Sequence, residues 1–170
     1  MSYTTERPRG RLPQGKLIVP GWPDIEGLGI PVHSAGTANR GYYQPFVMPY
    51  TTSLVSIEFW NSSGTNNHDL GLYDAVGNRL GSKGSTASTA NTIHIWTPST
   101  PIAVQAGKLY FAAFATAGTA TILAYSGNGM YNPRTGRAVQ ASALALPNPA
   151  TFAAAGADAF IPVLKLTFTE

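Results

Sequence analysis

Two neighbouring stretches, Leu54-Val55-Ser56-Ile57-Glu58-Phe59-Trp60 and Asp69-Leu70-Gly71-Leu72-Tyr73-Asp74, decide the fold class of this chain. In the first stretch, Val55, Ile57 and Phe59 alternate with polar residues. Successive side chains of a strand point to opposite faces, so this alternation predicts a strand with one apolar face and one polar face, the polar face formed by Ser56 and Glu58. The polar residues 61–68 and the segment Ala75-Val76-Gly77-Asn78 predict turns. Together these signals predict an antiparallel sheet with one buried face.

Similar signals recur along the rest of the chain. Residues 108–116 form the most apolar stretch, and apolar side chains occupy both of its faces, as is typical of a central strand. One of these faces carries Leu109, Phe111 and Ala113, and the other carries Tyr110, Ala112 and Phe114. The remaining predicted strands span residues 42–48, 79–83, 92–97, 102–104, 120–126 and 161–169.

Two details of these strands lead to specific expectations. Pro45 predicts an edge position for the strand at 42–48, because proline lacks the backbone N–H that a central strand needs. The alanine-rich segment 139–155, which Pro147 and Pro149 interrupt, predicts a loop with one short helical turn. About eight strands with closely spaced turns predict an all-β fold, an antiparallel β-sandwich of the jelly-roll or immunoglobulin-like type.

The composition suits one domain with little surface charge. The chain has 170 residues, of which only 11% are charged, against roughly 25% in typical soluble domains. It contains no cysteine, which excludes disulfides and thiolate metal sites. No apolar run approaches the roughly 18 residues of a membrane helix, and the N-terminus lacks the apolar core of a secretory signal. We therefore expect no membrane partner.

Residues 1–41 predict an extended arm, and residues 42–170 predict the β-sandwich. Five prolines and seven glycines exclude a long helix or a central strand from this arm. Its apolar side chains need a surface to cover them, and the arm can pack either on its own domain or on a neighbouring subunit. Residues 1–16 carry a net charge of +3, from four basic and one acidic residue (4 − 1), whereas the rest of the chain is neutral (7 − 7).

The arm contains the candidate attachment residues. The basic residues Arg7, Arg9, Arg11 and Lys16 are expected to steer it toward an acidic surface. The apolar residues Leu17, Ile18, Val19 and Trp22 are expected to supply the buried contact. Four basic residues without interleaved aromatics would give only a weak, salt-sensitive contact with nucleic acid, so a nucleic-acid partner is not expected.

No catalytic or metal-binding motif occurs in the chain. His33, His68 and His94 lie far apart in the sequence and lack the spacing of zinc ligands. Asn66, Asn67, His68, Asp69 and Asp74 could supply oxygen ligands for calcium, but their spacing is better explained by a turn stabilised by local hydrogen bonds. Glu58 and Asp74 are the carboxylate pair that a glycosidase would need, and nothing in the sequence brings them together. We expect a protein that is not an enzyme and has no cofactor or metal.

Exposed aromatic residues are the better candidates for a binding surface. Trp60, Tyr73 and Trp96 fall opposite the strand faces assigned to the core, or at their ends, so they are candidate ligand-facing rings. Such rings bind sugars and also anchor protein interfaces. The alternative is that they belong to the core of the sandwich or to a subunit interface.

The segments GLYDAVGNRL (residues 71–80) and AGKLYFA (residues 106–112), together with the strand at 53–60, resemble one pattern. This pattern is similar to the jelly-roll domains of bacteriophage virion proteins, including capsid decoration and tail-fibre proteins, and also to the β-sandwiches of carbohydrate-binding modules. The resemblance covers roughly residues 50–125 and supplies no catalytic residues.

The resemblance implies a non-enzymatic structural protein of the virion, a capsid decoration or cement protein that attaches through its N-terminal arm and stabilises the particle. It implies synthesis in the cytoplasm of the bacterial host. Other virion proteins, the major capsid protein foremost, would be its partners, together with copies of itself in a homo-oligomer such as a trimer. The alternative is a glycan-binding or receptor-binding module of a phage tail fibre or similar adhesin.

Overall fold

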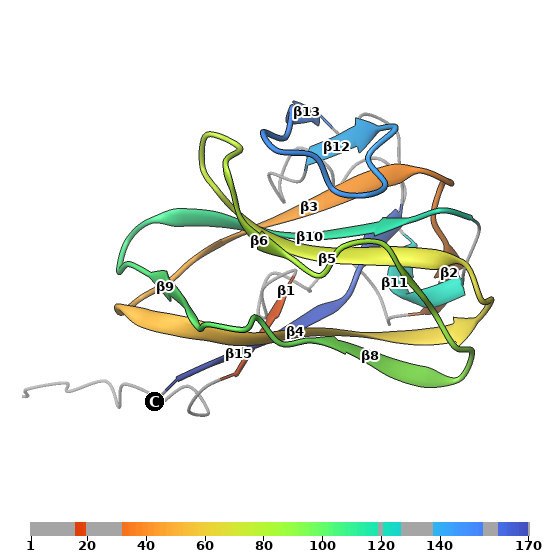
Figure 1. Cartoon of the computed structure of the whole chain (residues 1–170), viewed down its shortest axis with the longest axis horizontal. Helices are drawn as coiled ribbons and strands as arrows, with labels where there is room; N and C mark the ends of the chain where they lie inside the picture. The colour runs from red at the N-terminus through yellow and green to blue at the C-terminus, as the bar shows by residue number, and fades with distance from the viewer. Residues whose placement is uncertain (1–15, 20–31, 119–120, 127–137, 155–159, 170) are drawn as a thin grey trace, which may run out of the picture.

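The computed structural model describes residues 16–19, 32–118, 121–126, 138–154 and 160–169. This part of the chain consists of strands and turns, and no helix in it is long and apolar enough to cross a membrane. The strands form two antiparallel sheets that pack face to face as a β-sandwich (Figure 1). The predicted fold class is therefore confirmed.

Sheet A follows the order β1-β15-β4-β11-β14, with β2 paired to β11 and with β8 and β9 both paired to β4. Its strands are β1 (Lys16–Val19), β2 (Val32–Ala35), β4 (Thr52–Ser63), β8 (Thr92–Trp96), β9 (Ile102–Val104), β11 (Thr121–Ser126), β14 (Phe160–Pro162) and β15 (Leu164–Phe168).

Sheet B follows the order β13-β12-β3-β10-β5-β6, with β7 paired to β5. Its strands are β3 (Arg40–Val47), β5 (Asn67–Asp74), β6 (Arg79–Ser82), β7 (Thr86–Ala87), β10 (Leu109–Thr116), β12 (Ala138–Ala141) and β13 (Ala153–Ala154).

The main core lies between the two sheets. The rings of Phe59 on β4 and Phe114 on β10 meet edge to face with their centroids 4.9 Å apart, which is a favoured aromatic geometry. Both rings are almost fully buried. Other buried members of this core are Tyr42, Leu54, Ile57, Leu70, Leu72, Trp96, Ile122, Leu164, Leu166 and Phe168.

The predicted apolar face of β4 is correct for Ile57 and Phe59 but wrong for Val55. The pairing of β4 with β15 shifts register, so that Thr167 lies opposite Ser56 while Phe168 lies opposite Leu54. A bulge of this kind places one additional residue in one strand and changes which side chains face the core. As a result Leu54 is fully buried, whereas Val55 is only half-buried.

Strand β10 is the central strand of sheet B, as its two apolar faces predicted. It pairs along its whole length with β3 on one side, and from Tyr110 to Thr116 with β5 on the other. Tyr110, Ala112 and Phe114 join the core between the sheets. Phe111 and Ala113 point to the outer face of sheet B, where they are also buried. A second cover must therefore lie over that outer face.

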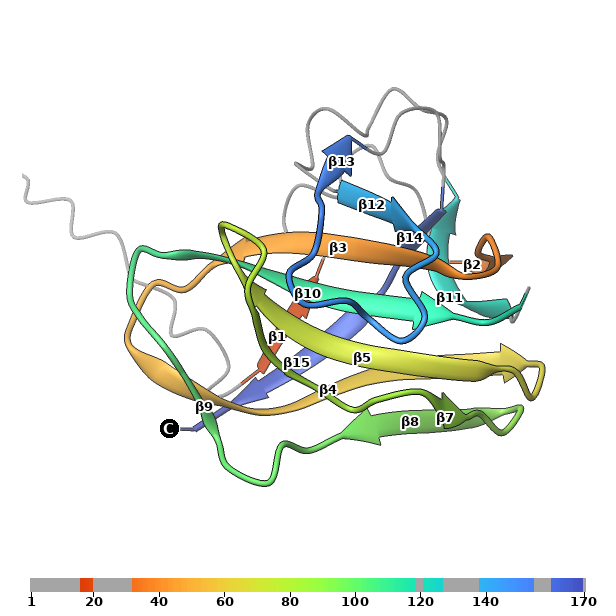
Figure 2. The same cartoon turned by 45° about the horizontal axis from the view of Figure 1, so that its top comes forward.

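That cover is residues 142–152, which we call the covering segment, together with the short strands β12 and β13 (Figure 2). It buries a second core that includes Tyr43, Tyr73, Phe111 and Leu146, with Phe152 packed against it. The expectation of a loop with a helical turn at 139–155 is wrong for its described residues, because β12 pairs with β3 and no helical turn forms. Backbone pairing with a sheet edge has replaced the local hydrogen bonds that a helix would supply.

Pro45 lies at a local edge, although β3 as a whole does not. Strand β12 pairs only with Arg40, Gly41, Tyr42 and Tyr43 of β3. At Pro45 the only paired neighbour among the described strands is β10, where Pro45 lies opposite Phe111. The missing N–H of proline is tolerated in this position.

Two segments of the N-terminal region belong to sheet A. Strand β1 pairs with β15, with Ile18 opposite Lys165, and β2 pairs with β11, with His33 opposite Leu123. The expected boundary between residues 41 and 42 falls inside β3. Of the two alternatives for the arm, packing on its own domain is therefore the one that holds for the backbone of these two segments.

We predict that Gly77→Ala destabilises the protein more than Gly107→Ala. Both glycines have positive φ angles, 94° and 72°, which cost an L-residue about 1–2 kcal/mol. Only at Gly77 does an added Cβ meet backbone, the carbonyl oxygen of Ala150 at 2.5 Å, whereas it meets nothing at Gly107. The contact adds about 1–3 kcal/mol to the loss at Gly77. Urea unfolding of both variants measures the difference, and equal losses would contradict the packing of the covering segment on this turn.

Candidate functional site

The turn between β5 and β6 is built around the carboxylate of Asp74. This carboxylate accepts hydrogen bonds from the backbone N–H groups of Val76 (3.0 Å) and Asn78 (2.8 Å) and from the side-chain amide of Asn78 (2.8 Å). Slight burial raises the pKa of Asp74, but hydrogen bonds from Asn78, Val76 and Gly77 outweigh it and hold the pKa below its ordinary value. These hydrogen bonds hold the turn together, and Val76 extends from it into solvent, with 77% of its surface exposed.

This turn forms one wall of a pocket of about 370 Å³. Strand β9 and the start of β10 form the other walls, and the apolar lining includes Val76, Leu80 and Leu109. The size lies at the lower end of the range for small-molecule sites. It is also large enough to receive one or two apolar side chains of a partner protein.

Polar groups surround the apolar part of the pocket. Lys108, Gln105 and Tyr110 line it together with Asp74. The hydroxyl of Tyr110 accepts a hydrogen bond from the backbone N–H of Gln105 at 2.9 Å, so its own hydrogen remains available to donate. The arrangement suits an apolar group that carries a hydrogen-bond acceptor beside it.

Exposed apolar side chains gather around this pocket. Of the seven large hydrophobic residues that are exposed in the described part of the chain, three line the pocket: Val76, Leu80 and Leu109. Val47 lies opposite Leu109 in the pairing of β3 with β10. Tyr50 belongs to the loop 48–51, which bonds to the turn 105–107 through Gly107 N–H to Met48 O (2.8 Å). We call these five residues the loop-end surface.

A second polar cluster is buried at the start of β5. His68 is 1% exposed, and its Nε2 lies 3.2 Å from the Lys83 ammonium nitrogen, which donates to it. Its ring lies 4.9 Å from that of Phe59 and 4.7 Å from that of His94. Burial, with Lys83 and His94 contributing further, lowers the pKa of His68 to about 3, so the ring is neutral at pH 7.

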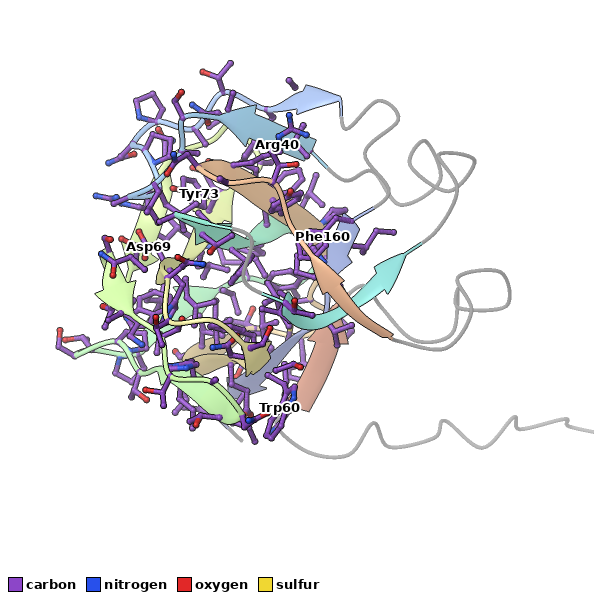
Figure 3. All side chains as sticks on the ribbon, turned by 90° about the vertical axis from the view of Figure 1, so that its right-hand side faces the viewer. Arg40, Trp60, Asp69, Tyr73 and Phe160 are labelled. Atoms are coloured by element: carbon purple, nitrogen blue, oxygen red, sulfur yellow. The ribbon has the colours of Figure 1, made fainter. Side chains whose placement is uncertain are left out.

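Asp69 lies next to His68 but on the outer face of sheet B. Its fully buried carboxylate accepts hydrogen bonds from Gly84 N–H (2.9 Å) and Leu146 N–H (3.0 Å), so it ties the covering segment to β5. Burial raises the pKa of Asp69, although these backbone hydrogen bonds oppose the shift. Figure 3 shows Asp69 and Tyr73 on the same side of the sandwich, with Trp60 at its opposite margin.

The structure corrects two of the three candidate ligand-facing rings. Tyr73 is fully buried beneath the covering segment, and its hydroxyl donates a 2.6 Å hydrogen bond to Pro147 O. Trp96 is 7% exposed and packs in the main core, because β8 turns Ile93 and Ile95 outward instead. Trp60 is half-buried on the outer face of sheet A, opposite Ile93 on β8.

The candidate attachment residues divide into two groups. Arg7, Arg9, Arg11 and Trp22 lie outside the described residues. Lys16, Leu17, Ile18 and Val19 form β1, and their backbone pairs with residues 164–167 of β15. Their role in attachment stays a prediction.

The acidic candidates do not converge. Asp74 lies at the opposite end of β5 from Asn67, about 24 Å away at the rise of an extended strand. Glu58 belongs to sheet A, where it forms an ion pair with Lys165, whereas Asp74 belongs to sheet B. In the described part of the chain, no group of three or more His, Asp or Glu side chains is placed to hold a metal ion.

Sequence reasoning missed both the pocket and the contact between His68 and His94. These two histidines lie on different sheets, so no periodicity within one strand relates them. Val76 and Leu80 were a usable signal, because they lie in and beside a predicted turn, and turns run over the surface, where apolar side chains are exposed.

Comparison with known proteins does not assign this chain to a family. No protein-family model matches its sequence, and no curated protein matches it significantly.

We predict that acidification destabilises the protein through His68. An unfolded histidine has a pKa of about 6.5, whereas burial holds the pKa of His68 at about 3 in the folded state. Between these values the unfolded state binds more protons, so the free energy of unfolding falls as pH decreases, by up to about 1.4 kcal/mol per pH unit.

Urea unfolding between pH 4 and 7.5 tests this prediction against the variant His68→Phe. The raised pKa of Asp69 acts in the opposite direction, because acid favours the folded state through it. Asp69 is present in both proteins, so the difference between their slopes isolates His68. Equal slopes would show that His68 is not held neutral by burial.

Proposed function

We propose that this chain is a non-enzymatic structural protein of a phage virion, a decoration or cement protein that binds the assembled capsid and stabilises it. The loop-end surface is the observation that carries this proposal. Three of its five exposed apolar side chains line a pocket, and the other two lie on β3 opposite Leu109 and in the loop 48–51. Exposed apolar surface of this kind marks protein-binding sites. The resemblance of residues 71–80 and 106–112 to virion jelly-roll domains supports the same conclusion.

The N-terminal region has a separate part in this proposal. Residues 1–15 carry Arg7, Arg9 and Arg11 against Glu6, a net charge of +2 (3 − 1). Such a charged segment speeds the approach to an acidic surface more than it strengthens the final complex. Trp22 then adds apolar contact, and the loop-end surface supplies contact from the folded body.

Low surface charge supports membership of an assembly. With 11% charged residues, the body presents little that would repel identical copies or neutral neighbours. The partners that we propose are the major capsid protein and further copies of this chain.

A glycan-binding module of a tail fibre or adhesin is the second candidate. It is favoured by Tyr50, which is 42% exposed near a pocket that also offers Lys108 and the Tyr110 hydroxyl. An exposed ring beside hydrogen-bond donors is a common arrangement for sugars.

We predict that the double variant Leu80→Asp/Leu109→Asp weakens binding to purified empty capsids by about a hundredfold. Each carboxylate would be desolvated in an apolar contact, at a cost of about 1–3 kcal/mol. Both positions are more than a third exposed, so the fold should tolerate the change. The control is Ser63→Asp, an exposed position at the end of β4 that lies away from β9 and the pocket. Cosedimentation with capsids measures the affinity, and a glycan array is run in parallel. Micromolar sugar binding without capsid binding would replace the first proposal by the second.

We predict that deletion of residues 1–15 slows capsid binding and reduces its dependence on salt. The deletion removes a net charge of +2 and leaves every described strand intact. Electrostatic steering affects the association rate, so the dissociation rate should change little. The variant Arg7→Gln/Arg9→Gln, which leaves Arg11 balanced by Glu6 and so removes the same net charge of +2, should behave like the deletion. An unchanged association rate at low salt would contradict a steering role.

A further inference from the structure

One edge of sheet A has no partner strand among the described residues. Strands β8 and β9 pair with the same side of β4 and follow one another along it. Figures 1 and 2 both show β8 along the outer margin of the sandwich. A strand in this position presents a row of free N–H and C=O groups, which can pair with another strand.

The outward face of β8 is apolar. Ile93 and Ile95 are 50% and 52% exposed, while His94 and Trp96 point inward. In the register with β4, Ile93 lies opposite Trp60 and Ile95 lies opposite Glu58. An apolar row from Trp60 to Ile93 therefore reaches the edge of the sheet and ends there.

This edge lacks the usual protection against pairing. Proteins commonly guard such edges with charged side chains, especially lysine. Residues 84–107, which include β8 and β9, are 24 residues without a single Asp, Glu, Lys or Arg. By contrast, two of the outer strands carry charge: β6 has Arg79 and β1 has Lys16.

An uncharged edge suits pairing with an identical edge. A two-fold axis brings both copies of any charged residue of this edge into the same interface, where the like charges repel each other. Residues 84–107 bring no such repulsion.

We propose that β8 pairs antiparallel with β8 of a second copy about a two-fold axis at His94. This register pairs all five residues of the strand. It sets Ile93 opposite Ile95 of the second copy and Thr92 opposite its Trp96, so residues of the same face meet, as antiparallel pairing requires. Sheet A then continues across the axis, and Trp60, Ile93 and Ile95 of the second copy form one apolar row.

The contact closes on itself. A symmetric two-fold interface uses the same edge of both copies and leaves no second edge of this kind free. The product is a dimer and not a fibre. A trimer cannot be built from this contact alone.

Sedimentation of the full chain at micromolar concentrations tests whether the pair forms. We expect a dimer, and we expect Ile93→Lys and Ile95→Lys each to raise its dissociation constant at least about tenfold, since two lysines are brought to one interface. Thr151→Lys is the control, because it places lysine on an exposed residue of the covering segment, over sheet B and away from both β8 and the loop-end surface. An unchanged circular dichroism spectrum of each variant confirms that folding is intact, since loss of a dimer by itself lowers the apparent melting temperature. A monomer at all concentrations, a trimer, or an equal effect of Thr151→Lys would overturn the proposal.

Cysteine cross-linking tests the register, since the chain has no cysteine of its own. Directly opposite residues lie about 4.5–5.5 Å apart between Cα atoms, within disulfide range, whereas diagonal neighbours lie about 7–8 Å apart. The double variant Ile93→Cys/Ile95→Cys should therefore form a covalent dimer on mild oxidation. The two single variants should cross-link at least about tenfold more slowly. Single variants that cross-link as fast as the double variant would overturn the register about His94.

This inference stands apart from the proposed virion role. The pairing is measured on the isolated chain, whereas the role is measured by capsid binding. A dimer that does not bind capsids would leave the pairing in place and remove the role.

Discussion

Burial of both faces of β10 is the constraint on which the rest of this structure depends. Sheet A covers one face, and the other needs a cover that no sheet supplies. Residues 142–152 provide this cover, although they form little regular strand pairing. Side chains of sheet B therefore hydrogen-bond to some of the backbone groups of this segment: Tyr73 donates to Pro147 O, Arg79 donates to Leu146 O, and Asp69 accepts from Leu146 N–H.

The buried polar groups follow from the same constraint. A carboxylate as buried as that of Asp69 is stable only when N–H groups surround it, and it receives two from separate segments. Its neighbour His68 faces the other core, where apolar rings and Lys83 favour the neutral imidazole. Successive residues of one strand thus connect two different layers, because their side chains point to opposite faces.

Apolar side chains that neither core absorbs are concentrated at two places. One is the loop-end surface, where turns between strands hold Val76 and Leu109 outward. The other is the uncharged edge at β8. Few charged side chains must lose their water when a protein covers these patches, so both patches favour contact with protein.

The sequence by itself determined the antiparallel strands, the central position of β10 and the turn at Asp74. These follow from local alternation and turn chemistry, which need only neighbouring residues. Only the tertiary structure decided which face of β8 is buried. Both of its faces carry large apolar residues, and Gly81 on β6 leaves the space that Trp96 and Ile102 fill. The bulge at Val55, the covering segment over β10 and the contact of His68 with His94 also depend on partners distant in the chain. Periodicity along one strand indicates which residues share a face, but it does not indicate which other part of the chain packs against that face.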